Sequence, residues 1–285
     1  IYTCGRNGEY HISSNMGSTW VSSSVGSNQT RHYKMFFLNE TTGYMVNNDG
    51  NIYFTTDRGL NWNSRAIIPS TILYDIKMLS SSVGYTVGSG ERILKTTDGG
   101  TTWSHGTLAT PAGQVLGLYM LSEQTGYICG ENGAVYRTTD GFQNVTLITD
   151  TIALQGKLIH DVYAYNEQNV TAVGQGGTIL NSFGTNLIPA FQTLYGEDII
   201  AVDGRGAQSM VMAGASGTVY YFDGLLPVEL TAFSASTLNG KIHLLWSTAT
   251  ESNNRGFSIE RKSENTWQEI GFILGAGSST TKRVY

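Results

Sequence analysis

Charged residues are sparse in this sequence, so the few that recur at equivalent places are the first candidates for chemistry. They make up 14% of the 285 residues. Asp75 and Asp161 each begin an apolar segment that predicts a strand, and Lys34 begins another such segment. Two facing carboxylates about 5–10 Å apart would suit a glycosidase. We therefore take Lys34, Asp75, His160, Asp161 and Asp198 as a candidate binding site, with hydrolysis by its aspartates as one alternative.

A second group of acidic residues lies in a repeated octet that predicts a tight turn. In Thr96–Trp103, the Asp98 carboxylate can accept hydrogen bonds from the N–H groups that follow it. Gly100 can take a positive φ, and Trp103 begins the returning strand. The turn residues of the copies are Asn15, Gly17, Trp20, Asp57, Gly59, Trp62, Asp98, Gly100, Trp103 and Asp140. Because Ca²⁺ needs several converging oxygens and these carboxylates recur singly, we expect a structural role and no metal site.

The sequence offers no nucleophilic or redox centre. His160 and Asp161 have no Ser in a Gly-x-Ser-x-Gly pattern to complete a triad, and the five histidines show no metal-ligand spacing. Cys4 and Cys129 hold the same place in two well-separated repeats, so we expect buried thiols and no disulfide. We predict no cofactor, and the pattern favours a protein that is not an enzyme.

An internal repeat of 40 to 44 residues must position all of these side chains. Its marker is a small apolar residue, found at Cys4, Val46, Val87, Cys129, Val173 and Ala213. Each full copy predicts four short strands separated by turns, which is the pattern of a β-propeller blade. The innermost strands are expected at residues 34–38, 75–79, 117–121 and 161–165. The candidate site would then line the mouth of the central channel.

The repeat predicts an all-β fold with a change of domain near residue 226. Residues 1–225 are expected to form a propeller of six four-stranded blades, with a seventh left open because the first and last copies are incomplete. Residues 226–285 predict part of a β-sandwich, being fewer than the roughly 100 residues of a complete one. In this second domain Asn239-Gly240 predicts a hairpin, and Trp246 is expected in the core.

The octets, together with pairs such as Gly84-Tyr85, resemble those of Asp-box (BNR-type) propellers over residues 1–224. That superfamily includes sialidases, xyloglucan hydrolases, the sortilin luminal domain and photosystem II assembly factors of the Ycf48 type. The pattern is most similar to the last group. The resemblance implies the fold and leaves the function open, since the Arg-Ile-Pro motif of sialidases and the arginine patch of the Ycf48 type are both missing.

The C-terminal residues resemble a different family. Leu226–Phe233, Trp246–Glu251 and Asn253–Arg261 are similar to a fibronectin III-like (Ig-like) β-sandwich module of secreted Bacteroidetes-type proteins. That module usually precedes a sorting domain of the type IX secretion system. The resemblance implies an exported protein, extracellular or at the cell surface, with a tether to the outer surface through a region beyond Tyr285.

The composition limits the classes of partner that this protein is expected to bind. A net charge of −5 without a Lys/Arg cluster argues against nucleic acid, and no apolar run reaches the roughly 18 residues of a membrane-spanning helix. We therefore expect an exported, non-enzymatic propeller that binds a protein or glycan partner. The alternatives are a carbohydrate-active hydrolase acting at the channel mouth and an assembly factor for a membrane complex.

Overall fold

The computed structural model describes residues 1–90, 92–105, 113–152, 154–183, 186–192, 196–206, 209–222, 230–238, 240–249, 251–263, 266–279 and 281–285. The regular structure in these ranges is β-strand, apart from two single-turn 3₁₀ helices, η1 (Glu131–Gly133) and η2 (Gln175–Gly177). This described part of the chain contains no helix long and apolar enough to span a bilayer. The protein is therefore all-β, as predicted.

Six small antiparallel sheets follow one another along the chain, and we call them blades 1 to 6. Blade 1 holds β1 (Tyr2–Cys4), β2 (Glu9–Ile12) and β3 (Val21–Ser24). Blade 2 holds β4 (His32–Phe37), β5 (Gly43–Asn47), β6 (Asn51–Thr55) and β7 (Asn63–Ile67). Blade 3 holds β8 (Leu73–Met78), β9 (Gly84–Gly88), β10 (Arg92–Thr96) and β11 (Ser104–His105).

The next three blades continue the pattern. Blade 4 holds β12 (Val115–Met120), β13 (Gly126–Gly130), β14 (Val135–Thr138) and β15 (Thr146–Leu147). Blade 5 holds β16 (Ile159–Asn166), β17 (Asn169–Gly174), β18 (Thr178–Phe183) and β19 (Asn186–Gln192). Blade 6 holds β20 (Ile199–Gly206), β21 (Ser209–Gly214) and β22 (Val219–Phe222). Blades 1 and 6 thus have three described strands each, in line with the incomplete first and last repeats.

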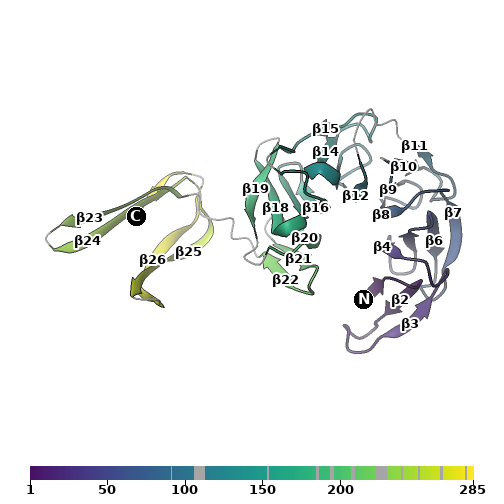
Figure 1. Ribbon diagram of the computed structural model, residues 1–285, viewed down its shortest axis with the longest axis horizontal. Coiled ribbons are helices and arrows are strands. Elements are labelled where there is room, and N and C mark those ends of the chain that lie inside the picture. The colour runs from purple at the N-terminus through teal and green to yellow at the C-terminus, as the bar shows by residue number, and fades with distance from the viewer. Residues whose placement is uncertain are drawn as a thin grey trace. The chain divides into compact units, whose positions relative to one another are not determined.

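The blades succeed one another in an arc, as the propeller prediction requires. Figure 1 shows β4, β8, β12 and β16 on the inner side of this arc and β7, β11, β15 and β19 on the outer side. The inner strands begin two residues earlier than predicted, at His32, Leu73, Val115 and Ile159. A register shift with the second strand follows each of these residues. Such a bulge adds one residue to the strand and turns the side chains that follow it.

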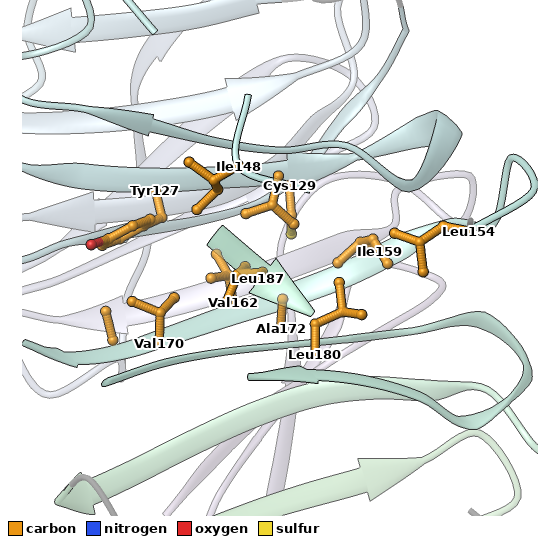
Figure 2. Packing of buried hydrophobic residues seen from close by; sticks show 12 residues of the cluster. Tyr127, Cys129, Ile148, Leu154, Ile159, Val162, Val170, Ala172, Leu180 and Leu187 are labelled. Carbon is orange, nitrogen blue, oxygen red and sulfur yellow. The ribbon is translucent and has the colours of Figure 1, made fainter. Parts of the chain in front are cut away.

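The apolar core lies between consecutive blades, because each blade is a thin sheet that buries both of its faces. The largest cluster joins the facing sides of blades 4 and 5 (Figure 2). In it, Tyr127 and Cys129 of β13 meet Ile159 and Val162 of β16 and Leu180 of β18. Similar clusters join blades 3 and 4, blades 2 and 3, and blades 1 and 2.

The two cysteines are both free thiols, and their surroundings differ from the prediction in one respect. Cys129 is buried, whereas Cys4 on β1 is half-buried. Burial nevertheless raises the pKa of Cys4 to about 11 and the pKa of Cys129 well above its ordinary value. Both side chains therefore stay neutral in the physiological range.

The C-terminal residues make a second compact unit, formed by residues 205–210 and 221–285, and the first unit holds residues 1–204 and 211–220. The second unit contains a sheet of β23 (Leu230–Leu238), β24 (Lys241–Thr248) and β27 (Arg283–Val284), and a hairpin of β25 (Glu251–Ser263) and β26 (Thr266–Ser279). Trp246 is buried there, edge-on to Phe257 at 5.3 Å between ring centroids and stacked on Tyr285. The predicted boundary at residue 226 and Asn239 of the predicted hairpin lie outside the described residues, while the pairing of Leu238 with Lys241 closes that hairpin.

Candidate binding pocket on the inner strands

The octet turns are each closed by a buried hydroxyl as well as by the carboxylate or amide oxygen. In blade 3, Asp98 Oδ1 accepts hydrogen bonds from the backbone N–H groups of Thr101 (3.0 Å) and Thr102 (2.9 Å). Thr96 Oγ1 donates to Asp98 Oδ1 (2.9 Å) and accepts from the N–H of Gly100 (2.8 Å). The equivalent hydroxyls are those of Ser13, Thr55 and Thr138, all buried. Sequence analysis missed this role, although a Ser or Thr two residues before each Asp or Asn was the available signal.

Blade 4 keeps this turn without a glycine at the fifth position. Phe142 stands there with φ +67°, and its N–H still donates to Thr138 Oγ1 (2.9 Å). Left-handed backbone costs a residue other than glycine ~1–3 kcal/mol. The Phe142 side chain offsets that cost by packing edge-on against Tyr85 of blade 3, with 5.6 Å between ring centroids. In Gly100 and Gly59 the same position has φ of +84° and +78°.

The turn carboxylates are anions whose lone pairs are used inside their own turns. Hydrogen bonds from the Thr102 side chain and backbone hold the pKa of Asp98 at about 2, and those from Asn61 do the same for Asp57. Similar bonds from Asn144 lower the pKa of Asp140. Within the described ranges, no three His, Cys, Asp or Glu side chains gather as a metal site would require.

The turn tryptophans are unequal in burial. Trp62 is buried edge-on against Tyr10 (6.2 Å) and Phe37 (5.9 Å), which joins blades 1 and 2. Trp103 is half-buried and its Nε1–H donates to the carbonyl oxygen of Gly100 (3.0 Å). Trp20 is 41% exposed, so the equivalent tryptophan of blade 1 is only partly buried.

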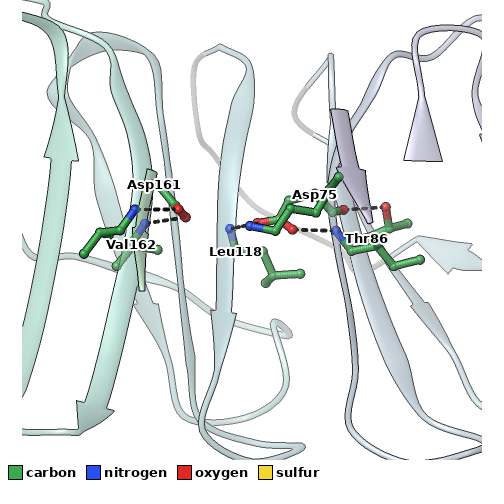
Figure 3. Close-up of polar contacts among 8 residues, drawn as sticks. Asp75, Thr86, Leu118, Asp161 and Val162 are labelled. Atoms are coloured by element: carbon green, nitrogen blue, oxygen red, sulfur yellow. Dashed lines mark hydrogen bonds and ion pairs between the residues drawn. The ribbon is translucent and has the colours of Figure 1, made fainter. Parts of the chain in front are cut away.

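Asp75 and Asp161 fasten one inner strand to the next. Asp75 Oδ1 accepts from the N–H of Ile76 (2.7 Å), and Oδ2 accepts from the N–H of Leu118 on β12 (3.1 Å). Asp161 repeats this geometry two blades later, accepting from Val162 (2.9 Å) and from Val202 on β20 (3.0 Å). Figure 3 shows both carboxylates bridging neighbouring strands. They are 3% and 7% exposed, and each is already held by two backbone donors.

A pocket of about 420 Å³ opens over these inner strands. Its wall takes side chains from every blade from 2 to 6 and combines charged, aromatic and aliphatic groups. The charged members are Lys34, Asp75, Lys77, Asp161 and Asp203, and the aromatic members are Phe36 and Tyr119. A volume of this size is typical of ligand pockets.

The pocket brings together three of the five predicted site residues. Lys34 Nζ lies 3.6 Å from Asp75 Oδ2, with the lysine side chain 41% exposed. Asp75, followed by the more distant Asp161 and Asp203, raises the pKa of Lys34 above its ordinary value, so this lysine is a cation. Burial raises the pKa of Asp75, and it raises that of Asp161 to about 6, with Lys34 opposing the shift in both cases.

His160 and Asp198 do not line the pocket. His160 is the extra residue of the bulge between Ile159 and Asp161, and it pairs with Asp198 instead of lining the pocket. Its Nε2 lies 3.8 Å from Asp198 Oδ2, and Asp198 Oδ1 accepts from the N–H of Gly176 (2.8 Å). Desolvation lowers the pKa of His160 below its ordinary value despite this neighbour. The predicted five-residue site therefore divides into a pocket group and a separate pair that connects blades 5 and 6.

Lys77, Tyr119 and Asp203 also line the pocket and were not among the predicted site residues. The Nζ of Lys77 lies between two rings, 4.9 Å from the centroid of Phe36 and 5.3 Å from that of Tyr119. Tyr119 also meets Tyr163 edge-on at 5.3 Å. Burial lowers the pKa of Lys77. Lys77, Tyr119 and Asp203 each stand two residues after the repeat position that Lys34, Asp75 and Asp161 occupy in their own blades. The repeat could therefore have predicted them.

Residues 54–187 match the family described as "Photosynthesis system II assembly factor YCF48". None of the curated proteins matches the chain.

Solved structures of low identity share its fold. A structure of YCF48 bound to a D1 peptide is 15% identical with a TM-score of 0.60, covering 86% of this chain and 84% of that one. YCF48 from Cyanidioschyzon merolae is also 15% identical, with a TM-score of 0.51 and coverage of 78% and 90%. The RRP9 WD40 repeats are 11% identical, with a TM-score of 0.61 and coverage of 75% and 68%. These likenesses show a β-propeller fold and do not extend to function.

Proposed function

We propose that this protein binds a segment of a partner protein in the pocket on the inner strands of its propeller, without catalysing a reaction. The observation that carries the proposal is the pocket itself, about 420 Å³ and walled by five blades. Its mixture of aromatic rings and fixed charges is suited to anchoring a few side chains of a peptide.

The comparisons support a protein ligand in preference to a glycan. The matched family is described as an assembly factor, and one similar propeller was solved with a peptide bound to it. The fold likeness alone does not carry that property to this chain, so the partner class is part of the proposal.

The contacts of the two inner carboxylates count against the hydrolase alternative. A glycosidase needs one carboxyl group free to give a proton and another free to attack or to activate water. Asp75 and Asp161 are instead both buried and both engaged with backbone N–H groups of the adjacent blade. Asp198 lies away from the pocket, paired with His160. Asp75 and Asp161 therefore hold adjacent blades together and are not free to act as a general acid and a nucleophile.

A display selection tests the proposal. The whole chain is used to select binders from a library of random peptides, and their affinities are measured by fluorescence anisotropy. Ala201, which lines the pocket from β20, is then replaced by tryptophan to fill the space. We expect Ala201→Trp to weaken the selected peptides by at least about tenfold, which is ~1.4 kcal/mol.

The matched control is Leu147→Trp, on an exposed position of the outer strand β15. It should leave the affinities within about twofold, or ~0.4 kcal/mol. Lys77→Gln serves as a second pocket variant if the larger side chain at residue 201 disturbs folding. Selected peptides that bind all variants equally, or a selection that yields no binder, would overturn the proposal.

We also propose that the protein is exported and that the second unit is a fibronectin III-like module that connects the propeller to the cell surface. The support is the set of sequence segments described above and the aromatic cluster around Trp246. Fractionation of the native host with an antibody against the propeller tests it, and a protein found only inside the cells would contradict it.

A further inference from the structure

The charges in the pocket are not balanced. Three carboxylates and two ammonium groups line it. Lys34 is paired with Asp75 at 3.6 Å, which accounts for one charge of each sign. Lys77, Asp161 and Asp203 have no ion pair within 4 Å among the described residues. With all groups ionised the wall therefore carries one excess negative charge.

The unpaired carboxylates belong to neighbouring strands. Asp161 lies on β16 and Asp203 on β20, and the N–H of Val202, next to Asp203, is bound to Asp161 Oδ2 (3.0 Å). Lys77 lies apart from them on β8, with β12 in between, and its Nζ faces the rings of Phe36 and Tyr119. One side of the pocket is thus acidic, and the hydrogen bond from the Val202 N–H to the Asp161 carboxylate joins the two strands that carry its carboxylates.

Asp161 has capacity for another donor. A carboxylate offers about four lone-pair sites, and the backbone of Val162 and Val202 occupies two. The group is fixed in place by these bonds, so a cation would find it already oriented. Burial also raises the pKa of Asp161 to about 6, against the attraction of Lys34, so an added cation nearby would favour its ionised form.

We infer that the pocket receives a lysine or arginine side chain of the bound segment, with Asp161 and Asp203 as its counter-ions. The inference rests on the proposed function, since it names the side chain that the partner inserts. A cation brings the wall to neutrality, whereas an anion would raise the excess to two negative charges in a partly desolvated space. The aliphatic stem of a lysine or arginine would pack on Val162 and Val211, both in the wall.

Capped pentapeptides with a single variable residue test this directly. The whole chain is titrated with Ala-Gly-Lys-Gly-Ala and with its Arg, Gln and Glu analogues, while NMR follows the backbone amides of Leu118 and Val202. The lysine and arginine peptides should bind at least about tenfold more tightly than the glutamine peptide, as a charge-assisted hydrogen bond in a desolvated site predicts. The glutamate peptide should bind most weakly.

Two charge-removing variants and one control complete the test. Asp161→Asn and Asp203→Asn should each abolish most of the preference for lysine over glutamine. Glu40→Gln removes one negative charge at a side chain that is 91% exposed and away from the pocket, and it should leave the preference unchanged. If Asp161→Asn folds poorly, the wild type is compared with Asp203→Asn, whose side chain is exposed.

The outcomes separate this inference from the proposed function. Equal binding of the lysine and glutamine peptides, or a preference that survives both aspartate variants, overturns the inference and leaves the pocket as a peptide site. Absence of amide shifts with the lysine and arginine peptides also overturns it. The display selection with Ala201→Trp decides the proposed function independently of this charge preference.

Discussion

At the scale of single residues, one buried hydroxyl connects two parts of the octet turn. Thr96 Oγ1 donates a hydrogen bond to the carboxylate of Asp98 and accepts one from the N–H of Gly100. The arrangement recurs at Ser13, Thr55 and Thr138, while the glycine varies. The hydroxyl is thus the more constant part of the turn.

Replacing Thr96 by valine should lower the free energy of unfolding by about 1–3 kcal/mol, because the buried N–H of Gly100 loses its acceptor while the side-chain shape is kept. Urea denaturation followed by circular dichroism measures this. Thr101→Val is the control, since Thr101 is exposed and its hydroxyl makes one 3.2 Å bond to the backbone of Asp98. Equal effects of the two variants would show that burial of the hydroxyl is unimportant.

Titration of Asp161 should be visible in the pH dependence of stability. Its pKa rises from 3.8 to about 6 on folding, through burial and the neighbouring Asp75, against the attraction of Lys34. The folded state then binds more protons between these values, so the contribution of Asp161 to stability is complete only below pH ~4 and is lost as the pH rises through ~6. Wild type should therefore lose about 2 kcal/mol relative to Asp161→Asn between pH 4 and pH 7.

Urea unfolding of both proteins at intervals across that range measures the difference. The comparison removes the titration of Asp161 itself, whose charged and ionisable neighbours are Lys34, Asp75 and Cys129. A difference that stays constant with pH, or one that changes in the opposite direction, would contradict the raised pKa.

At the scale of elements, each blade depends on its neighbour for burial. Tyr44 of blade 2 is buried and its hydroxyl donates to the carbonyl oxygen of Gly99 in the turn of blade 3 (3.1 Å). Tyr85 of blade 3 does the same to Glu123 of blade 4 (2.8 Å). Together with the carboxylates of Asp75 and Asp161, these bonds orient the thin sheets whose apolar faces form the core.

The cluster between blades 4 and 5 offers a test of this dependence. Leu180 of β18 is fully buried in it, so Leu180→Ala should lower the free energy of unfolding by about 2–5 kcal/mol through lost burial and the cavity left behind. Leu147→Ala, at a leucine of β15 that is 43% exposed, should cost less than about 1 kcal/mol. Chemical denaturation compares the two, and similar losses would mean that the inter-blade cluster does not hold the blades together.

At the scale of the whole molecule, the chain consists of two units with separate cores. The propeller buries its apolar residues between blades, and the C-terminal unit buries Trp246 against Phe257 and Tyr285. The second unit also leaves large apolar side chains such as Ile242 and Leu274 in solvent. Its core is small, so its stability rests on few contacts.

Trp246→Ala should therefore destabilise the second unit by about 3–5 kcal/mol without changing the propeller. Differential scanning calorimetry of the full chain should resolve two transitions, of which only one moves to lower temperature in the variant. The amide spectrum of the pocket strands is a second readout and should stay unchanged. A shift of both transitions would contradict independent units.

The repeated turns and the order of the strands were predictable from the sequence alone. These features depend on hydrogen bonds within eight residues and on the alternation of apolar and polar side chains along short strands. Both patterns can be recognised in a short stretch of sequence. The resemblance to Asp-box propellers rested on the same local pattern. Strand limits were less accurate, because the bulge before Asp75 and Asp161 depends on pairing with the next strand.

Which charged residues share a pocket depends on contacts between blades, which cannot be inferred from local sequence. Asp75 meets Leu118 and Asp161 meets Val202 across a whole blade, over separations of 43 and 41 residues. Asp161 and His160 are adjacent in sequence but belong to different sites, because the pairing of β16 with β17 makes His160 the extra residue of a bulge. Lys77 and Asp203 line the pocket because residues two positions apart on a strand share a side. The packing of consecutive blades brings these sides together.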